Sequence, residues 1–183
     1  MKKQVIFFHG AGDGGYEADA MLAASLRNEL GAAYKVHFPK MSQDEKESFF
    51  GSQWPKQIGI EISSIKGEVI LVGHSLGASM LLKYLSETKI KKQIAGVFLA
   101  APPFWSGNED WVQPLKLQKD FSDKLPKDIP IYFYRCRDDD VVPYDHFTIY
   151  KQNIPWAVFR EVATGGHQFN DDLTIIAKDI RQL

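Results

Sequence analysis

The feature that most constrains the fold of this chain is a glycine turn set between a strand pattern and a helix pattern. Residues 69–72 (VILV) form an uninterrupted apolar run, residues 73–77 read GHSLG, and residues 78–85 continue with helix-forming and apolar side chains. An uninterrupted apolar run of this length predicts a strand that is covered on both faces, as in a parallel sheet. This part of the chain therefore predicts a buried strand that passes through a tight turn directly into a helix.

The same alternation continues through the 183 residues of the chain. Helical spacing of apolar residues also occurs at 18–30 and 169–183, and strand patterns recur at 5–8, 35–38, 69–72, 95–99, 131–134 and 157–160. A chain of this length is expected to form one domain, residues 1–183. Alternating strands and helices predict the α/β class, here a three-layer α/β/α sandwich around a mostly parallel six-stranded sheet. Functional loops are then expected at the carboxyl ends of the strands.

Two stretches interrupt this alternation. Residues 102–128 are rich in proline and aromatic side chains, and they are read as a small insertion between two strands. Residues 39–55 are polar and acidic and end at Trp54-Pro55, where Pro55 fits the first turn of a helix.

The charge balance argues for a small-molecule partner. Lysine and arginine number 22 against 23 aspartates and glutamates, so no net field attracts the chain to nucleic acid or to an anionic membrane. Cys136 is the only cysteine, which excludes an internal disulfide and makes a cytoplasmic location the expectation. The apolar run at 5–8 is too short for a signal peptide or a membrane span. The composition leaves the oligomeric state open.

The turn at 73–77 carries the chemistry. A Gly-x-Ser-x-Gly sequence between a strand and a helix is typical of a nucleophile elbow, which makes Ser75 the candidate nucleophile. A serine hydroxyl needs a base that takes its proton and donors that hold the developing oxyanion. The base is expected after the last strand, where His167 follows residues 157–160. The other histidines, His9, His37, His74 and His146, are more easily explained as structural.

Three acids follow the strand at 131–134, where a carboxylate that orients the base belongs. Only one of Asp138, Asp139 and Asp140 can orient His167, and a neighbour fits the role of a solvated turn residue or of a cap on the helix near Pro143. A metal site is disfavoured because no second cluster of ligands is suitably spaced. We therefore expect neither a metal nor a cofactor.

Several motifs together resemble a known superfamily. They are the elbow at 73–77, residues 100–105 (AAPPFW), residues 38–41 with Trp54, residues 138–143 (DDDVVP) and residues 166–167. In these positions the chain resembles the α/β-hydrolase superfamily, and in detail the compact serine hydrolases of the retinoblastoma-binding protein nine and YdeN type. The resemblance implies a minimal α/β-hydrolase fold with a Ser–Asp–His triad.

The resemblance also implies roles for individual residues. In such hydrolases the acid commonly stands in an Asp-x-x-Val-Pro sequence, which selects Asp139. The oxyanion donors are the backbone N–H of Leu76, directly after the nucleophile, and that of Ala11, with Gly12 as the alternative. Gly10, His74, Phe104 and Trp105 are the candidates for the substrate pocket. The aromatic side chains of the insertion, Phe104, Trp105, Trp111 and Phe121, either line this pocket or pack beneath the loop.

These patterns leave two candidate functions, and one glycine pattern also has to be weighed as a dinucleotide-binding site. The first function is hydrolysis of a small acyl ester or thioester through an acyl-enzyme on Ser75; the second is a binding module that keeps the fold without catalysis. Gly10, Gly12 and Gly15 also match a dinucleotide-binding spacing. That reading needs an acid at the end of the second strand, and residues 34–39 (YKVHFP) contain none.

Overall fold

A computed structural model of the chain describes residues 2–12, 14–42 and 52–183. In chain order the strands are β1 (Lys3–Phe8), β2 (Tyr34–His37), β3 (Val69–His74), β4 (Ile94–Ala100), β5 (Ile131–Cys136) and β6 (Val158–Val162). They form one sheet in the order β2-β1-β3-β4-β5-β6, and every neighbouring pair is parallel. The predicted α/β class and six-stranded sheet are confirmed, with strand ends shifted by one or two residues.

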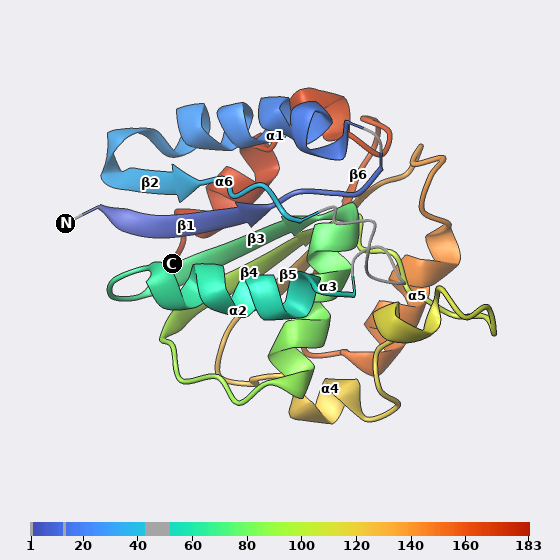
Figure 1. Cartoon of the computed structure of the whole chain (residues 1–183). Coiled ribbons are helices and arrows are strands. Elements are labelled where there is room, and N and C mark those ends of the chain that lie inside the picture. Colours follow the sequence, from blue (N-terminus) through green and yellow to red (C-terminus); the bar gives the residue numbers. More distant parts are fainter. Residues whose placement is uncertain (1, 13, 43–51) are drawn as a thin grey trace.

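Helices cover both faces of the sheet, which gives the three predicted layers (Figure 1). The helices are α1 (Gly15–Leu30), α2 (Trp54–Ser64), α3 (Ser75–Glu87), α4 (Phe121–Lys124), α5 (Tyr144–Asn153) and α6 (Thr174–Ile180). One apolar core lies between the sheet and α1 with α6, and a second lies between the sheet and the other helices. None of the helices in the described parts of the chain has the length and hydropathy needed to span a membrane.

Two helix predictions need correction. The helix expected at 169–183 begins only at Thr174, because Phe169, Asn170 and Asp171 have φ values of 52°, 50° and 56°. These left-handed conformations break a helix, and the Asn170 N–H instead donates to the carbonyl oxygen of Gly165 at 2.8 Å. The helix expected at 18–30 begins three residues earlier, at Gly15, and its apolar residue Met21 is 58% exposed.

The two stretches that interrupt the alternation differ in how far they are described. The predicted insertion between β4 and β5 contains a short 3₁₀ turn (Gln113–Leu115) and the single-turn helix α4. Pro55 is the second residue of α2, as predicted for a first helical turn. Residues 43–51 of the polar stretch at 39–55 lie outside the described residues.

Close backbone packing explains the two glycines of the turn after β3. A Cβ on Gly77 would clash with the carbonyl oxygens of Phe8 and His9, so the start of α3 lies directly against the end of β1. A Cβ on Gly73 would lie 2.7 Å from the Cα of Ala78, a distance that side chains do not tolerate. Between the two glycines, Ser75 adopts φ 50°. The packing thus places Ser75 beside the loop that leaves β1.

This packing predicts that Gly77→Ala destabilises the protein by about 1–3 kcal/mol or more, because the clash is with backbone that cannot rotate away. Thermal or urea unfolding monitored by circular dichroism measures the loss. Gly96→Ala in β4 is the matched control, since its added methyl meets the ends of the Leu183 and Phe98 side chains, which can move. Equal stability of the Gly77→Ala and Gly96→Ala variants would contradict the packing argument.

Candidate active site

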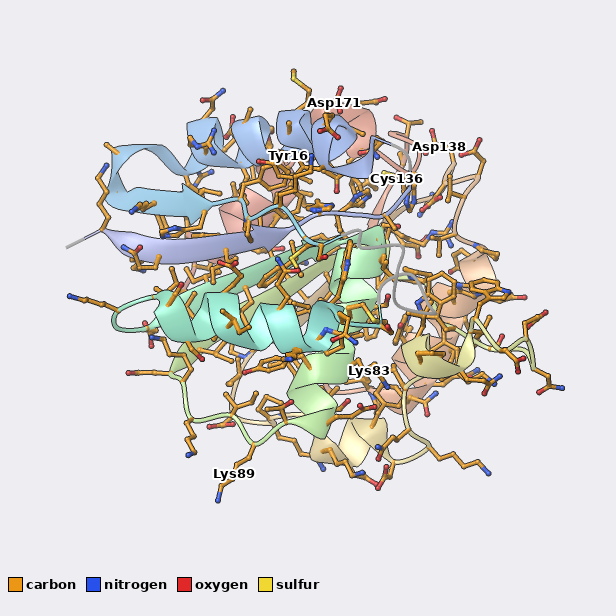
Figure 2. The ribbon with its side chains drawn as sticks, in the orientation of Figure 1. Tyr16, Lys83, Lys89, Cys136, Asp138 and Asp171 are labelled. Atoms are coloured by element: carbon orange, nitrogen blue, oxygen red, sulfur yellow. The ribbon has the colours of Figure 1, made fainter. Side chains whose placement is uncertain are left out.

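The predicted site residues lie at one edge of the sheet, where the strands end. Ser75 follows β3, the three acids 138–140 follow β5, and His167 follows β6. Because the strands are parallel, their carboxyl ends meet at this edge. Cys136 and Asp138 mark the end of β5 there (Figure 2). Cys136 itself is buried, and burial raises the pKa of its thiol to about 11, which suits a structural rather than a nucleophilic residue.

Ser75 is the first residue of α3 and is held in a strained conformation. A positive φ in a residue with a Cβ costs roughly 1–3 kcal/mol and is typical of functional positions. The first N–H groups of a helix have no partner within the helix, and the Leu76 N–H is one of these. Ser75 therefore stands next to a backbone donor at the positive end of the helix dipole.

Asp139 and His167 are brought together by the structure. The Nδ1 atom of His167 lies 3.1 Å from Oδ2 of Asp139, and the Asp139 side chain is only 1% exposed. The other carboxylate oxygen of Asp139 accepts the N–H groups of Val141 and Val142, each at 2.9 Å. Burial raises the pKa of Asp139, but the hydrogen bonds from His167 and these N–H groups outweigh it and leave the pKa below its usual value. The ionised carboxylate holds a hydrogen on Nδ1 and leaves Nε2 free to accept a proton.

The neighbouring acids have other surroundings. The Asp138 carboxylate accepts the N–H groups of Gly165 and Gly166, at 3.1 and 2.9 Å, and so braces the turn that precedes His167. Asp140 is exposed, and within the described part of the chain its side chain makes no hydrogen bond. The alternative that Asp138 or Asp140 caps the following helix is wrong, because Pro143 occupies the N-cap of α5 and no side chain caps it.

The loop after β1 lies against the nucleophile. A Cβ on Gly10 would be 3.1 Å from the Cβ of Ser75. His9 fixes this loop: its Nε2 accepts the Met41 N–H at 2.9 Å, so its Nδ1 donates to the Gly10 carbonyl oxygen at 2.6 Å. Burial lowers the pKa of His9, in keeping with this neutral ring. Ala11 follows directly and borders the same cavity as Ser75, whereas Gly12 is not among the residues that line it.

A cavity of about 280 Å³ opens beside Ser75. Its walls are mainly apolar and come from the loop after β1, the start of α3, the insertion and the start of α5; they comprise Ala11, Ser75, Leu76, Pro103, Trp105, Trp111, Leu115, Val141, Val142 and His146. Trp105 lines it, and the ring of Trp111 meets that of Trp105 edge-on, with ring centres 5.8 Å apart. A larger hollow of about 760 Å³ lies at the opposite edge of the sheet and holds none of the candidate catalytic residues.

Three residues predicted for the pocket do not line this cavity. Phe104 turns toward α5, because its N–H donates to His146 Nδ1 at 3.0 Å and the preceding carbonyl accepts the Tyr150 hydroxyl. The partly buried ring of Phe104 packs on that of Tyr150, with ring centres 5.4 Å apart. Phe121 is buried. Gly10 packs against the Cβ of Ser75, and the side chain of His74 is buried in the core. The aromatic residues of the insertion therefore divide into two pocket walls and two packing residues.

Asp19 is the polar residue near the site that sequence reasoning missed. It is buried on α1, where Leu22, Ala23 and Leu26 share its face, and an acid at such a position was the available signal. Its Oδ2 accepts the Gly10 N–H at 2.6 Å and lies 2.8 Å from Nδ1 of His74. In the described ranges, no three or more His, Cys, Asp or Glu side chains are grouped so that they could hold a metal ion.

Comparisons with known proteins agree with this architecture. YdeN of Bacillus subtilis (strain 168) is 26% identical over 126 residues, which cover 65% of this chain and less than two thirds, 63%, of that relative. The crystal structure of the B. subtilis ydeN gene product superimposes with a TM-score of 0.67 at 18% identity and covers 100% of this chain and 98% of that one.

Two further solved structures share the fold at lower identity. The serine hydrolase CarC, involved in carbazole degradation, has a TM-score of 0.73 at 13% identity over 98% of this chain and 90% of that one. Est1E of Butyrivibrio proteoclasticus with bound ferulic acid has a TM-score of 0.70 at 14% identity over 98% and 87%. The family model described as serine hydrolase matches residues 23–172, well over half of the chain. The chain belongs to the serine hydrolase family, with the α/β-hydrolase fold of the YdeN type.

Proposed function

We propose that the protein hydrolyses a small acyl ester or thioester through a covalent acyl-enzyme on Ser75. The observation that carries this proposal is the 3.1 Å contact between Oδ2 of Asp139 and Nδ1 of His167. This contact lies at the same edge of the sheet as Ser75, which begins α3 in a strained conformation. A protein that only binds a ligand needs neither a strained serine nor a histidine oriented by a buried carboxylate. The geometry therefore favours catalysis over the binding-module alternative.

The reaction uses the chain's own groups in two steps. His167 Nε2 takes the proton of the Ser75 hydroxyl while the oxygen attacks the acyl carbon, and the N–H groups of Leu76 and Ala11 hold the oxyanion. His167 then gives the proton to the departing alcohol or thiol, which leaves the acyl group on Ser75. Water, activated by the same ring, releases the acid and restores the serine. Asp139 stays ionised throughout and stabilises the imidazolium that forms in each step.

The cavity sets the acyl group that this site accepts. Its volume of about 280 Å³ lies just below the range for drug-sized ligand sites, roughly 300–1,000 Å³. Trp105, Trp111 and Leu115 give it an apolar wall, which favours a short apolar or aromatic acyl group. We therefore propose a carboxylesterase or thioesterase for small acyl substrates.

The nucleophile assignment predicts covalent labelling by a fluorophosphonate probe. The intact protein is labelled and Ser75→Ala is not, as read by gel fluorescence and intact mass. Ser63→Ala is the matched control, because Ser63 is an exposed serine on α2 away from the site and its loss leaves labelling unchanged. Unlabelled parent protein, or equal labelling of Ser75→Ala, rules out the assignment.

The acid assignment predicts that Asp139→Asn lowers kcat by about 10⁴-fold, because the amide favours the wrong tautomer of the His167 ring. Asp140→Asn, one residue away and exposed, leaves kcat unchanged. Steady-state hydrolysis of p-nitrophenyl acetate measures both. Asp139 is the wrong choice if its asparagine variant keeps parental kcat while Asp138→Asn or Asp140→Asn abolishes turnover.

The cavity wall predicts the acyl-chain preference. Trp111→Ala enlarges the cavity and raises kcat/KM for the longer p-nitrophenyl esters relative to the acetate by about 10-fold, the discrimination that one methylene gives in an apolar pocket. Trp156→Ala, a partly exposed tryptophan outside this wall, leaves the chain-length profile unchanged. An unchanged profile for Trp111→Ala means that the acyl group binds elsewhere.

A further inference from the structure

A second carboxylate–histidine pair lies beneath the proposed triad, and the mechanism above does not use it. Asp19 on α1 and His74 at the end of β3 lie 2.8 Å apart, and both side chains are 1% exposed. His74 immediately precedes the nucleophile, and its ring centre lies 4.8 Å from that of His167. Burial of two ionisable groups is costly unless they are paired and hydrogen-bonded. The pair therefore needs an explanation.

The contacts of the pair join three segments that are far apart in the sequence. Asp19 Oδ2 accepts the N–H of Gly10, where the proposed oxyanion loop begins, at 2.6 Å. His74 Nε2 lies 3.0 Å from the carbonyl oxygen of His167, the proposed base. One pair of side chains thus contacts the loop after β1, the nucleophile turn and the loop after β6.

The partners of His74 determine where hydrogens must lie. A carbonyl oxygen can only accept, so the Nε2 atom facing His167 carries a hydrogen. Two bare acceptors would repel at 2.8 Å, so a second hydrogen lies between Nδ1 and Asp19 Oδ2. The pair shares one proton and carries no net charge, which makes it compatible with full burial.

We propose that Asp19 and His74 act as one positioning unit. The unit holds the loop that carries His167 and the oxyanion loop in fixed positions relative to Ser75. This role rests on the proposed hydrolase function. The unit touches no substrate; it acts through the backbone groups of His167 and Gly10. Its loss is expected to lower kcat rather than to weaken substrate binding, since the cavity walls are formed by other residues.

The surroundings of Asp19 support a shared network. Burial raises the pKa of Asp19, but the hydrogen bonds from His74 and from the Gly10 N–H lower it more. The network therefore joins the oxyanion loop, at the Gly10 N–H, to the base loop, at the His167 carbonyl oxygen.

The test compares two substitutions of His74 that differ in one property. His74→Leu has a similar volume but no donor, whereas His74→Gln keeps an N–H donor at the end of the side chain. We expect His74→Leu to lower kcat by about 10²-fold, the effect of misplacing a catalytic group by roughly 1 Å, with KM near the parental value. His74→Gln restores most of the loss. A packing role alone predicts the reverse order, because leucine fills the site and glutamine buries an extra polar group.

The matched control is His37→Leu, which removes a histidine bonded to Gln4 near the opposite edge of the sheet and leaves kcat unchanged. A parental kcat in folded His74→Leu overturns the proposal. If His74→Leu does not fold, ¹⁵N NMR of the His74 ring in the parent decides the matter. A hydrogen on Nε2 supports the proposal, and a bare Nε2 overturns it.

Fluorophosphonate labelling separates this inference from the function on which it rests. Failure to label the parent protein refutes the Ser75 chemistry, whatever His74 does. Normal labelling of the parent together with an equal labelling rate for His74→Leu refutes only the positioning role.

Discussion

The site depends on the contact between the first turn of α3 and the end of β1. Gly77 lies on the carbonyl oxygens of Phe8 and His9, where any side chain would clash. This contact fixes α3 so that Ser75 stands beside Gly10 with the loop after β1 on one side. The strained φ of Ser75 is then maintained by the packing on both sides of the turn rather than by the turn alone.

Around this contact, three acids each organise a different piece of backbone. Asp139 accepts two N–H groups of its own turn while it orients His167, and Asp138 accepts two N–H groups of the glycine turn before His167. Asp19 accepts the Gly10 N–H. Loops at the ends of parallel strands have many backbone donors without sheet partners, and carboxylates satisfy them. The acids near the site therefore act as structural acceptors as well as candidate catalysts.

Local patterns in the sequence were sufficient for much of this arrangement. The six strands were predictable because each is a short run rich in β-branched or aromatic residues, and the candidates Ser75 and His167 because a glycine turn and a chain order mark them. The contact of Asp19 with His74 was not predictable, since it joins residues 55 positions apart and needs the register of α1 against β3. The sequence left the direction of Phe104 open for a similar reason, because that direction is set by His146 and Tyr150 on α5. The late start of α6 depends on three left-handed residues that no apolar spacing reveals.

The most direct test of the account is a crystal structure of the protein after reaction with a phosphonate ester. We expect phosphorus bonded to Ser75 Oγ, its negatively charged oxygen within hydrogen-bonding distance of the Leu76 and Ala11 N–H groups, and its alkyl group between Trp105 and Trp111. His167 Nε2 should face the Ser75 oxygen while Nδ1 keeps its contact with Asp139. Phosphorus on another side chain, or an oxygen directed away from both N–H groups, would contradict the proposed catalytic site.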